Sequence, residues 1–276
     1  MTDKKTPAPQ PQRPGALRSD ITVTLNTLYA FNLWRGGGAP ASNIPSMNFC
    51  LSRLLWINSG SRGDDPYADQ MMYRLERLIA DSKKVLTELQ ETINAQLATL
   101  PKGVSFTEVT STYPIEMPAL GLSPLGSQCF FLFLQYDEIA KYTLHAFGLG
   151  LIDENKKARV IREAGRAVRS ILTQIRDWNY RDEGLTRKDV IAQTALAQAA
   201  ARRWGAPDED VFWGRHRSSF SPALNAQTVS VLQAMVAAAE IDAVPADDDP
   251  ASVLPDETGE QDETILPPDQ AADPEV

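Results

Sequence analysis

The stretch DDPYADQMMYRLERLIADSKKVLTELQETINAQLATL, residues 64–100, has the pattern of one long amphipathic helix. Asp64 or Asp65 is placed to cap this helix, and Pro66 suits its first turn because an N–H group there would have no helical partner. A helix of about 35 residues is roughly 50 Å long. Its hydrophobic residues recur mostly at steps of three and four and so share one face: Leu75, Ile79, Leu86, Leu89, Ile93, Leu97 and Leu100.

A stripe of this length can be buried in two ways. The helix packs against antiparallel neighbours inside the fold, or it forms a seam with another subunit. We expect the first arrangement, because one apolar stripe is what any packed helix shows.

The rest of the chain predicts a mainly α fold with a small β component (α+β). Residues 127–135, SQCFFLFLQ, fit either a short buried strand or the start of a buried helix. Residues 104–118 alternate weakly and resemble strand material broken by prolines, and residues 58–65 predict a turn. Further helices are expected over residues 44–58 with Asn43 as N-cap, over 136–148 and 154–175, from the capping pair Thr186 and Asp189 to just before Gly205, and over 221–241.

The N-terminal stretch SDITVTLNTLYAFNLWRGGG, residues 19–38, begins with a strand pattern. Apolar and polar residues alternate through residues 20–26, so a strand here has a polar face formed by Thr22, Thr24 and Asn26. Residues 27–34 fit either a short helix or a longer strand, and the glycines of RGGG predict a flexible linker. One strand followed by two helices is the order of a ribbon-helix-helix element, in which two copies pair their strands and the ribbon enters the major groove.

In that arrangement Thr22, Thr24 and Asn26 face the bases. Asparagine can pair with adenine, and threonine can contact the methyl group of thymine. Ser42 and Asn43 would begin the second helix, whose first amide groups can hold a phosphate. The strand face carries no basic residue, however, so the pattern alone favours an ordinary half-buried strand.

The net charge of −9 is unevenly distributed. Residues 240–276 hold 13 acidic and no basic residues, which leaves 27 basic against 23 acidic residues in 1–239. We therefore predict a disordered basic segment over 1–18, a single helical domain over 19–239 and a disordered acidic tail over 240–276. The charge of the tail suggests that it competes with DNA or recruits a protein partner.

A second charged feature lies in the predicted helix that begins near residue 154. Arg159, Arg162, Arg166 and Arg169 follow at steps of three, four and three, which places them along one face. Lys156 and Lys157 extend this row at its N-terminal end. Arginine matches phosphate geometry, so these six residues are candidates for phosphate binding. The alternative is a solvated helix face whose charges pair with acids from elsewhere in the fold.

Motifs of enzymes, metal sites and cofactor sites do not stand out. His145 and His216 lie in different segments without metal-ligand spacing, and we predict no enzyme, no metal and no cofactor. Cys50 and Cys129 lie in apolar runs and are expected to be free, buried thiols, as in a reducing cytoplasm. The chain begins with no signal-peptide pattern, and its most apolar run is too short to span a bilayer. A soluble cytoplasmic protein without membrane contact is expected.

Several short motifs in a fixed order carry a family resemblance: LRSDITVTLNTLYAFNLWRG, DDPYAD, GLID before AGRAVR, LTRKDV and FSPAL. Between residues 17 and 224 the chain thereby resembles the integrating-conjugative-element protein family of Proteobacteria, to which the AcaB activator of conjugative plasmids is similar. The resemblance implies a protein of a mobile genetic element, and the relation to AcaB implies a transcription activator of ribbon-helix-helix type. A second ribbon placement, at residues 127–135, would make the arginine-rich helix its second helix.

Together these features favour a dimeric DNA-binding regulator of a conjugative element. The alternative is a structural or adaptor protein of the transfer machinery that uses the long helix as its protein-binding surface.

Overall fold

The structure is a computed structural model that describes residues 21–38, 43–119 and 121–242. The chain divides into two compact units, residues 1–233 and residues 234–276. The first unit holds the helical domain described below. The predicted basic segment, most of the predicted acidic tail, and Ser42 lie outside the described residues.

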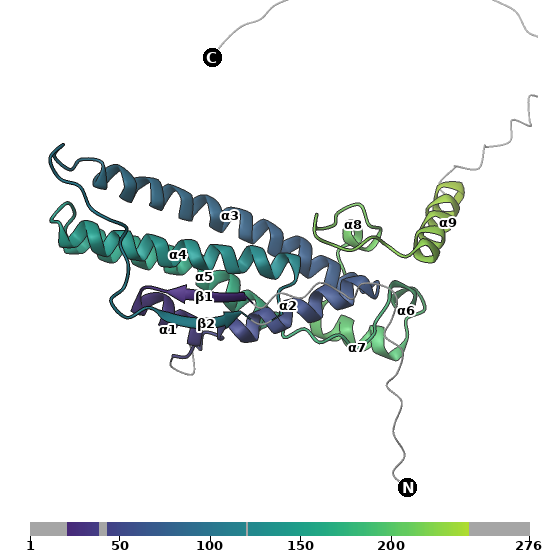
Figure 1. Cartoon of the computed structure of the whole chain (residues 1–276). Coiled ribbons are helices and arrows are strands. Elements are labelled where there is room, and N and C mark those ends of the chain that lie inside the picture. The colour runs from purple at the N-terminus through teal and green to yellow at the C-terminus, as the bar shows by residue number, and fades with distance from the viewer. Residues whose placement is uncertain (1–20, 39–42, 120, 243–276) are drawn as a thin grey trace, which may run out of the picture. The chain divides into compact units, whose positions relative to one another are not determined.

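The long helix is α3, Pro66–Leu97, with Asp65 as its N-cap. It packs against α4 (Pro124–Gly148), α5 (Glu154–Trp178) and α2 (Met47–Arg62), as Figure 1 shows. Most of the predicted stripe is buried in these contacts, with Leu89 and Leu100 half-buried. The apolar face of α3 is therefore buried inside the fold, as expected. A protein partner therefore cannot bind α3 through this stripe, and a protein-binding surface on α3 would have to use its exposed side.

The predicted N-terminal strand is β1, Ile21–Leu25. It pairs antiparallel with β2, Ile115–Ala119, in a two-stranded sheet in which Ile21 lies opposite Ala119. Val23 and Leu25 point into the core. A ribbon thus exists, but within the described residues both of its strands come from one chain.

The two helices after β1 also form. α1, Leu28–Arg35, begins after Thr27, whose hydroxyl accepts from the Ala30 amide, and this settles the strand-or-helix ambiguity of residues 27–34. The predicted start of α2 was wrong, because Ser46 and not Asn43 caps it. The predicted turn over residues 58–65 was also largely wrong, since α2 continues to Arg62 and buries Gly60 and Ser61.

Residues 127–135 belong to α4, so the second ribbon placement was wrong. Ser123 caps α4 and Pro124 opens it, and Cys129, Phe130 and Phe133 are buried. The region after α5 forms α6 (Arg187–Ile191), α7 (Ala195–Trp204) and α8 (Glu209–Phe212). The Thr186–Asp189 capping box is present, but the single helix expected there is two, because Thr194 caps α7 anew. α9 spans Ala226–Asp242.

Two kinds of feature are absent from the described part of the chain. No helix there has the length and apolar character to cross a bilayer. No three side chains of the metal-ligating types gather there into a cluster.

Candidate nucleic-acid interface

The candidate interface is the outer face of α5. The inner face of this helix is apolar and buried, and it includes Val168, Ile171 and Leu172. On the outer face Arg159, Arg162 and Arg166 are exposed, and Arg169 is half-buried. Within residues 21–242, and setting aside the positions not described, none of these four arginines forms an ion pair with a carboxylate. The pairing expected under the alternative interpretation is therefore not found there.

The two predicted lysines differ from the arginines. Lys157 pairs with Glu154 at 2.6 Å, and its ammonium group lies 4.0 Å from the centroid of the Phe147 ring. Lys156 is half-buried at the start of the helix. Lys157 is thus engaged inside the protein, and the arginines carry most of the available charge.

Arg169 is held in place by the fold. Its side chain folds back along α5, and Nη2 donates to the carbonyl oxygen of Arg162 at 3.3 Å. A β-carbon at Gly165 would come within 2.7 Å of Arg169 Nη1 and within 3.3 Å of Tyr136 Oη. The glycine therefore gives the guanidinium group room beside the Tyr136 phenol. Burial raises the pKa of Tyr136 to about 12, so the phenol is neutral near pH 7 and can donate a hydrogen bond.

Two hollows adjoin at Arg169 and Ile44. The first, of about 550 Å³, is also lined by Arg35, Tyr29, Asn32 and Tyr136, and the second, of about 500 Å³, by Arg166 and Arg176 among others. The second hollow also contains Asp177, which pairs with Arg176, and a neighbouring hollow places Asp81 and Glu163 beside Arg166. The arginines still outnumber the carboxylates along this groove, so an anion is the ligand it favours.

The sequence prediction missed two groove residues, Arg35 and Arg176. Arg35 precedes the glycines that were expected to form a flexible linker. Gly36 instead ends α1 with φ +68°, and its α-carbon packs against the backbone at Ile44, while Gly37 bridges to Ile44. This turn brings Arg35 next to α5. A positively charged residue before a glycine C-cap is the one signal that could have found it.

The predicted base-reading residues lie on the ribbon and its end. Thr22 and Thr24 are exposed, with Pro118 and Glu116 opposite them on β2. The amide group of Asn26 is engaged: Nδ2 donates to Asp137 at 3.3 Å and Oδ1 accepts from the Ser111 amide. Buried Asp137 also accepts from the backbone amides of Asn26 and Thr27, and so fixes the end of the ribbon to α4.

The sequence matches the family of the transcriptional regulator AcaB over residues 13–225. The chain belongs to the AcaB family of transcriptional regulators. Its structure is similar to the crystal structure of AcaB from uropathogenic E. coli, with 12% sequence identity, a TM-score of 0.49, and coverage of 70% of this chain and 94% of that one. No curated protein matches the chain. The relation to AcaB that the sequence motifs predicted is confirmed.

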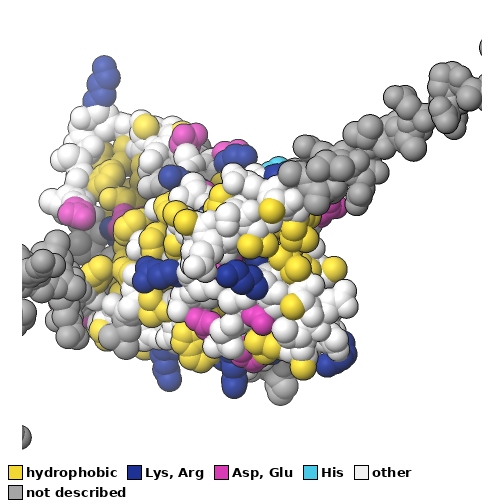
Figure 2. All heavy atoms as spheres, turned by 90° about the vertical axis from the view of Figure 1, so that its right-hand side faces the viewer, with side chains coloured by type: hydrophobic (Ala, Val, Ile, Leu, Met, Phe, Trp, Pro, Cys, Tyr) yellow, Lys and Arg dark blue, Asp and Glu magenta, His cyan; other side chains and the backbone are white. Residues whose placement is uncertain are grey.

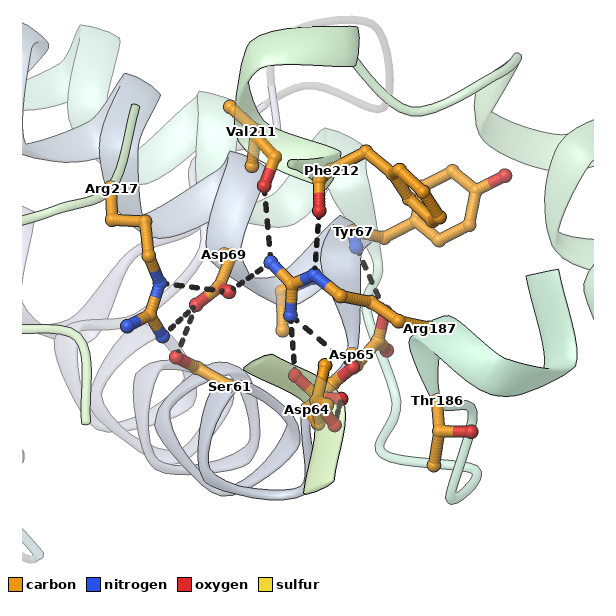
Figure 3. A network of polar contacts seen from close by, with 12 residues as sticks. Ser61, Asp64, Asp65, Tyr67, Asp69, Thr186, Arg187, Val211, Phe212 and Arg217 are labelled. Carbon is orange, nitrogen blue, oxygen red and sulfur yellow. Dashed lines mark hydrogen bonds and ion pairs between the residues drawn. The ribbon is translucent and has the colours of Figure 1, made fainter. Parts of the chain in front are cut away.

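Two of the motifs that carry the family resemblance in the sequence meet around one buried arginine (Figure 3). Arg187, from LTRKDV, is fully buried and donates to Asp64 at 2.6 Å and to Asp69 at 2.7 Å, both from DDPYAD. It also donates to the carbonyl oxygens of Val211 and Phe212 at the end of α8. These motifs therefore build the fold and lie away from the outer face of α5.

The same network has a second layer of donors. Arg217 donates to both carboxylate oxygens of Asp69, at 3.1 and 3.2 Å. The Ser61 hydroxyl also donates to the Asp69 carboxylate, at 2.5 Å. Thr228, in the first turns of α9, donates to Asp64 at 2.6 Å. Every carboxylate oxygen in the network thus has a donor, as buried charges require.

Asp65, in the same motif DDPYAD, joins α3 to the end of α5. Its carboxylate accepts from the Tyr67 amide at 2.8 Å and from the Tyr180 hydroxyl at 2.7 Å. Burial raises the pKa of Asp65 to about 6, although these hydrogen bonds act in the opposite direction. Asp65 therefore takes up a proton in the folded protein at a pH where it is ionised in the unfolded chain.

We expect Asp65→Asn to remove a pH dependence of stability. In the unfolded chain the carboxyl has a pKa near 3.9, whereas in the folded protein it is about 6. The folded state therefore gains stability by binding this proton more tightly. That gain is complete below about pH 3.9 and is lost as the pH rises through about 6. From pH 4 to pH 7 the free energy of unfolding of the wild type should fall by about 2 kcal/mol relative to that of the variant. Urea denaturation across this range measures the difference. Asp153→Asn, at the exposed N-cap of α5, is the control. If the difference in free energy of unfolding between the wild type and Asp65→Asn does not change with pH, burial does not raise the pKa of Asp65.

Proposed function

We propose that the chain is a DNA-binding transcriptional regulator of a conjugative mobile element, and that the outer face of α5 holds the phosphate backbone. The carrying observation is the row of Arg159, Arg162, Arg166 and Arg169, for which the described residues supply no ion-pair partner. At 1.5 Å per residue the 25 residues of α5 extend roughly 37 Å, close to one turn of B-DNA. Family membership supports the regulatory role; contact with DNA is the proposal.

The groove beside α5 adds specific contacts to this row. Arg35 and Arg169 converge on the first hollow, and the Tyr29 side chain lines it beside them. A guanidinium group binds a phosphate with two parallel hydrogen bonds, which fixes the register of the backbone as well as attracting it. We therefore place one backbone phosphate at Arg35 and Arg169.

Base recognition is proposed for the ribbon. β1 leads directly into α1, and α1 lines the groove, so the ribbon is joined to the phosphate site through one short helix. Thr22 and Thr24 are the base-contacting candidates. Asn26 can join them only after its amide leaves Asp137 and Ser111. Glu116, opposite Thr24, would repel phosphates, which favours contact with base edges over contact with the backbone.

The proposed regulator acts as a homodimer. Leu28 is 70% exposed at the start of α1, its neighbour Tyr29 is also exposed, and so is Ile21 at the start of β1. Apolar side chains gathered on one short segment are typical of a surface that another molecule covers. A second copy is the proposed partner, and sedimentation of the full chain measures whether it pairs.

A mobility-shift assay on the full chain tests DNA binding. The probes are duplexes from promoters of the element that encodes the chain, with unrelated duplexes as competitors and a salt series from 50 to 300 mM. We expect binding that falls steeply with salt, because phosphate contacts release counterions. A full chain that binds no duplex at 50 mM salt would overturn the proposed function.

The ribbon assignment has its own prediction. Thr22→Ala with Thr24→Ala should lower the preference for the cognate duplex over unrelated DNA by about tenfold, since a good base contact contributes roughly 1–3 kcal/mol of discrimination. Binding to unrelated DNA should not change. Thr87→Ala, at an exposed position of α3, is the matched control. If the double variant keeps the wild-type preference, the bases are read elsewhere.

A further inference from the structure

The exposed side of α2 carries an arginine between two aromatic rings. Phe49, Arg53 and Trp56 follow at steps of four and three, so they lie along one side of the helix. The guanidinium carbon of Arg53 lies 4.9 Å from the centroid of the Phe49 ring and 4.5 Å from that of Trp56. Phe49 is 36% exposed and Trp56 is 43% exposed. The result is a layered stack whose rings remain accessible to solvent.

The end of α5 holds this stack in position. Arg53 Nη1 donates to the carbonyl oxygen of Tyr180 at 3.0 Å, and Arg203 Nη2 donates to that of Asn179 at 2.9 Å. Cations are favoured at the C-terminal end of a helix, so these bonds explain where the two guanidinium groups lie. Each bond uses one nitrogen, and a guanidinium group has five N–H donors. Donors therefore remain for an external ligand.

Positive charge accumulates at this place. Burial, and then the neighbouring Arg181 and Arg203, lower the pKa of Arg53. Asp182 and Glu183 follow Arg181 in the chain, but over the described ranges neither forms an ion pair with any of the three arginines. The end of the molecule seen in Figure 2 shows Lys and Arg side chains lying among hydrophobic ones, with acidic ones interspersed. Cations and exposed rings at one place are what a ligand with both phosphates and flat rings requires.

We propose that Phe49, Arg53 and Trp56, with Arg181 and Arg203, form a site for single-stranded nucleic acid. The three arginines contact the phosphate backbone, and unpaired bases stack on the two rings. A duplex hides the faces of its bases and cannot use the rings in this way. An acidic peptide would use the arginines but would leave the rings without a matching partner. The site shares no residue with the outer face of α5, so it is separate from the proposed duplex binding.

Fluorescence anisotropy with the full chain tests this site. The probes are labelled 15-nucleotide strands of thymidine and of uridine, and a duplex of the same length. Phe49→Ala with Trp56→Ala should weaken binding of the single strands on the order of tenfold or more, since each stacked base contributes to affinity. Duplex binding should stay within about twofold of wild type, since the phosphate contacts on α5 remain. Arg162→Ala with Arg166→Ala should give the reverse pattern, so the two sites can fail independently.

Two further variants make the result specific. Phe131→Ala removes another exposed aromatic ring, one on α4 with no cation over it among the described contacts, and should leave single-strand binding unchanged. Trp56→Tyr keeps a ring and should retain most of the affinity. Preference for either strand type supports the site, since both carry unpaired bases. Failure of the wild type to bind either strand, equal binding by the double variant, or displacement by polyglutamate but not by an excess of unlabelled strand would overturn the proposal.

Discussion

Arg187→Met should lower the free energy of unfolding by about 3–5 kcal/mol. Methionine fills a similar volume without charge, so the substitution removes the buried partner of Asp64 and Asp69 with little change in packing. It also leaves the carbonyl oxygen of Phe212 without its donor, whereas the carbonyl oxygen of Val211 keeps the bond from the Gly214 amide. Buried groups left without partners bear the full desolvation penalty. Urea denaturation followed by circular dichroism measures the loss.

Two comparisons separate this effect from a general loss of charge. Arg215→Met removes an exposed arginine that pairs with Asp210 at 3.2 Å, and should change stability by less than about 1 kcal/mol. Adding Asp64→Asn to Arg187→Met should recover part of the loss, because the unpaired charge is removed. If Arg187→Met unfolds no more readily than Arg215→Met, the network does not stabilise the fold.

The elements that the sequence predicted well are those defined by local signals. The stripe of α3, its Asp65 cap and Pro66 lie within one continuous segment, and the Thr186–Asp189 capping box spans four residues. The misplaced start of α2 shows the limit of such signals. Asn43 and Ser46 are both good N-caps, and the bridge between Gly37 and Ile44 decides between them by keeping residue 44 extended.

Contacts between distant segments could not be predicted in this way. The partner strand of β1 lies about 90 residues away, and its sequence contains Pro118, which weakens the strand signal. Asp137, which engages Asn26, lies 111 residues further along the chain. A polar alternation cannot show whether an amide faces solvent or a buried carboxylate.

The candidate site divides along the same line. The row from Arg159 to Arg169 could be predicted, because a step of three or four along one helix fixes a common face. Arg35 and Arg176 join it through the turn at Gly36 and the contact of Arg176 with the carbonyl oxygen of Asn43. The motifs DDPYAD and LTRKDV, by contrast, meet in the buried Arg187 network. Motifs that carry the family resemblance therefore need not contain the candidate phosphate-binding residues.

The largest effect on duplex binding is expected from Arg162→Ala combined with Arg166→Ala. Both side chains are exposed near the middle of α5, and no carboxylate of the described residues forms an ion pair with either. Two charge-assisted contacts of about 1.5 kcal/mol each amount to roughly 100-fold in affinity. The loss should be the same for cognate and unrelated DNA, because phosphates carry no sequence information.

The salt dependence identifies the origin of that loss. Each phosphate contact contributes about 0.9 to the slope of log K against log salt, so the double variant should lie about 1.8 closer to zero than the wild type. Lys102→Ala with Arg215→Ala removes the same charge from the loops after α3 and α8, outside the groove, and should change the slope little. If the slope changes equally in the two double variants, DNA binding depends on net charge alone. A shift confined to Arg162 and Arg166 would place the backbone on α5, because counterions are released only where phosphates are bound.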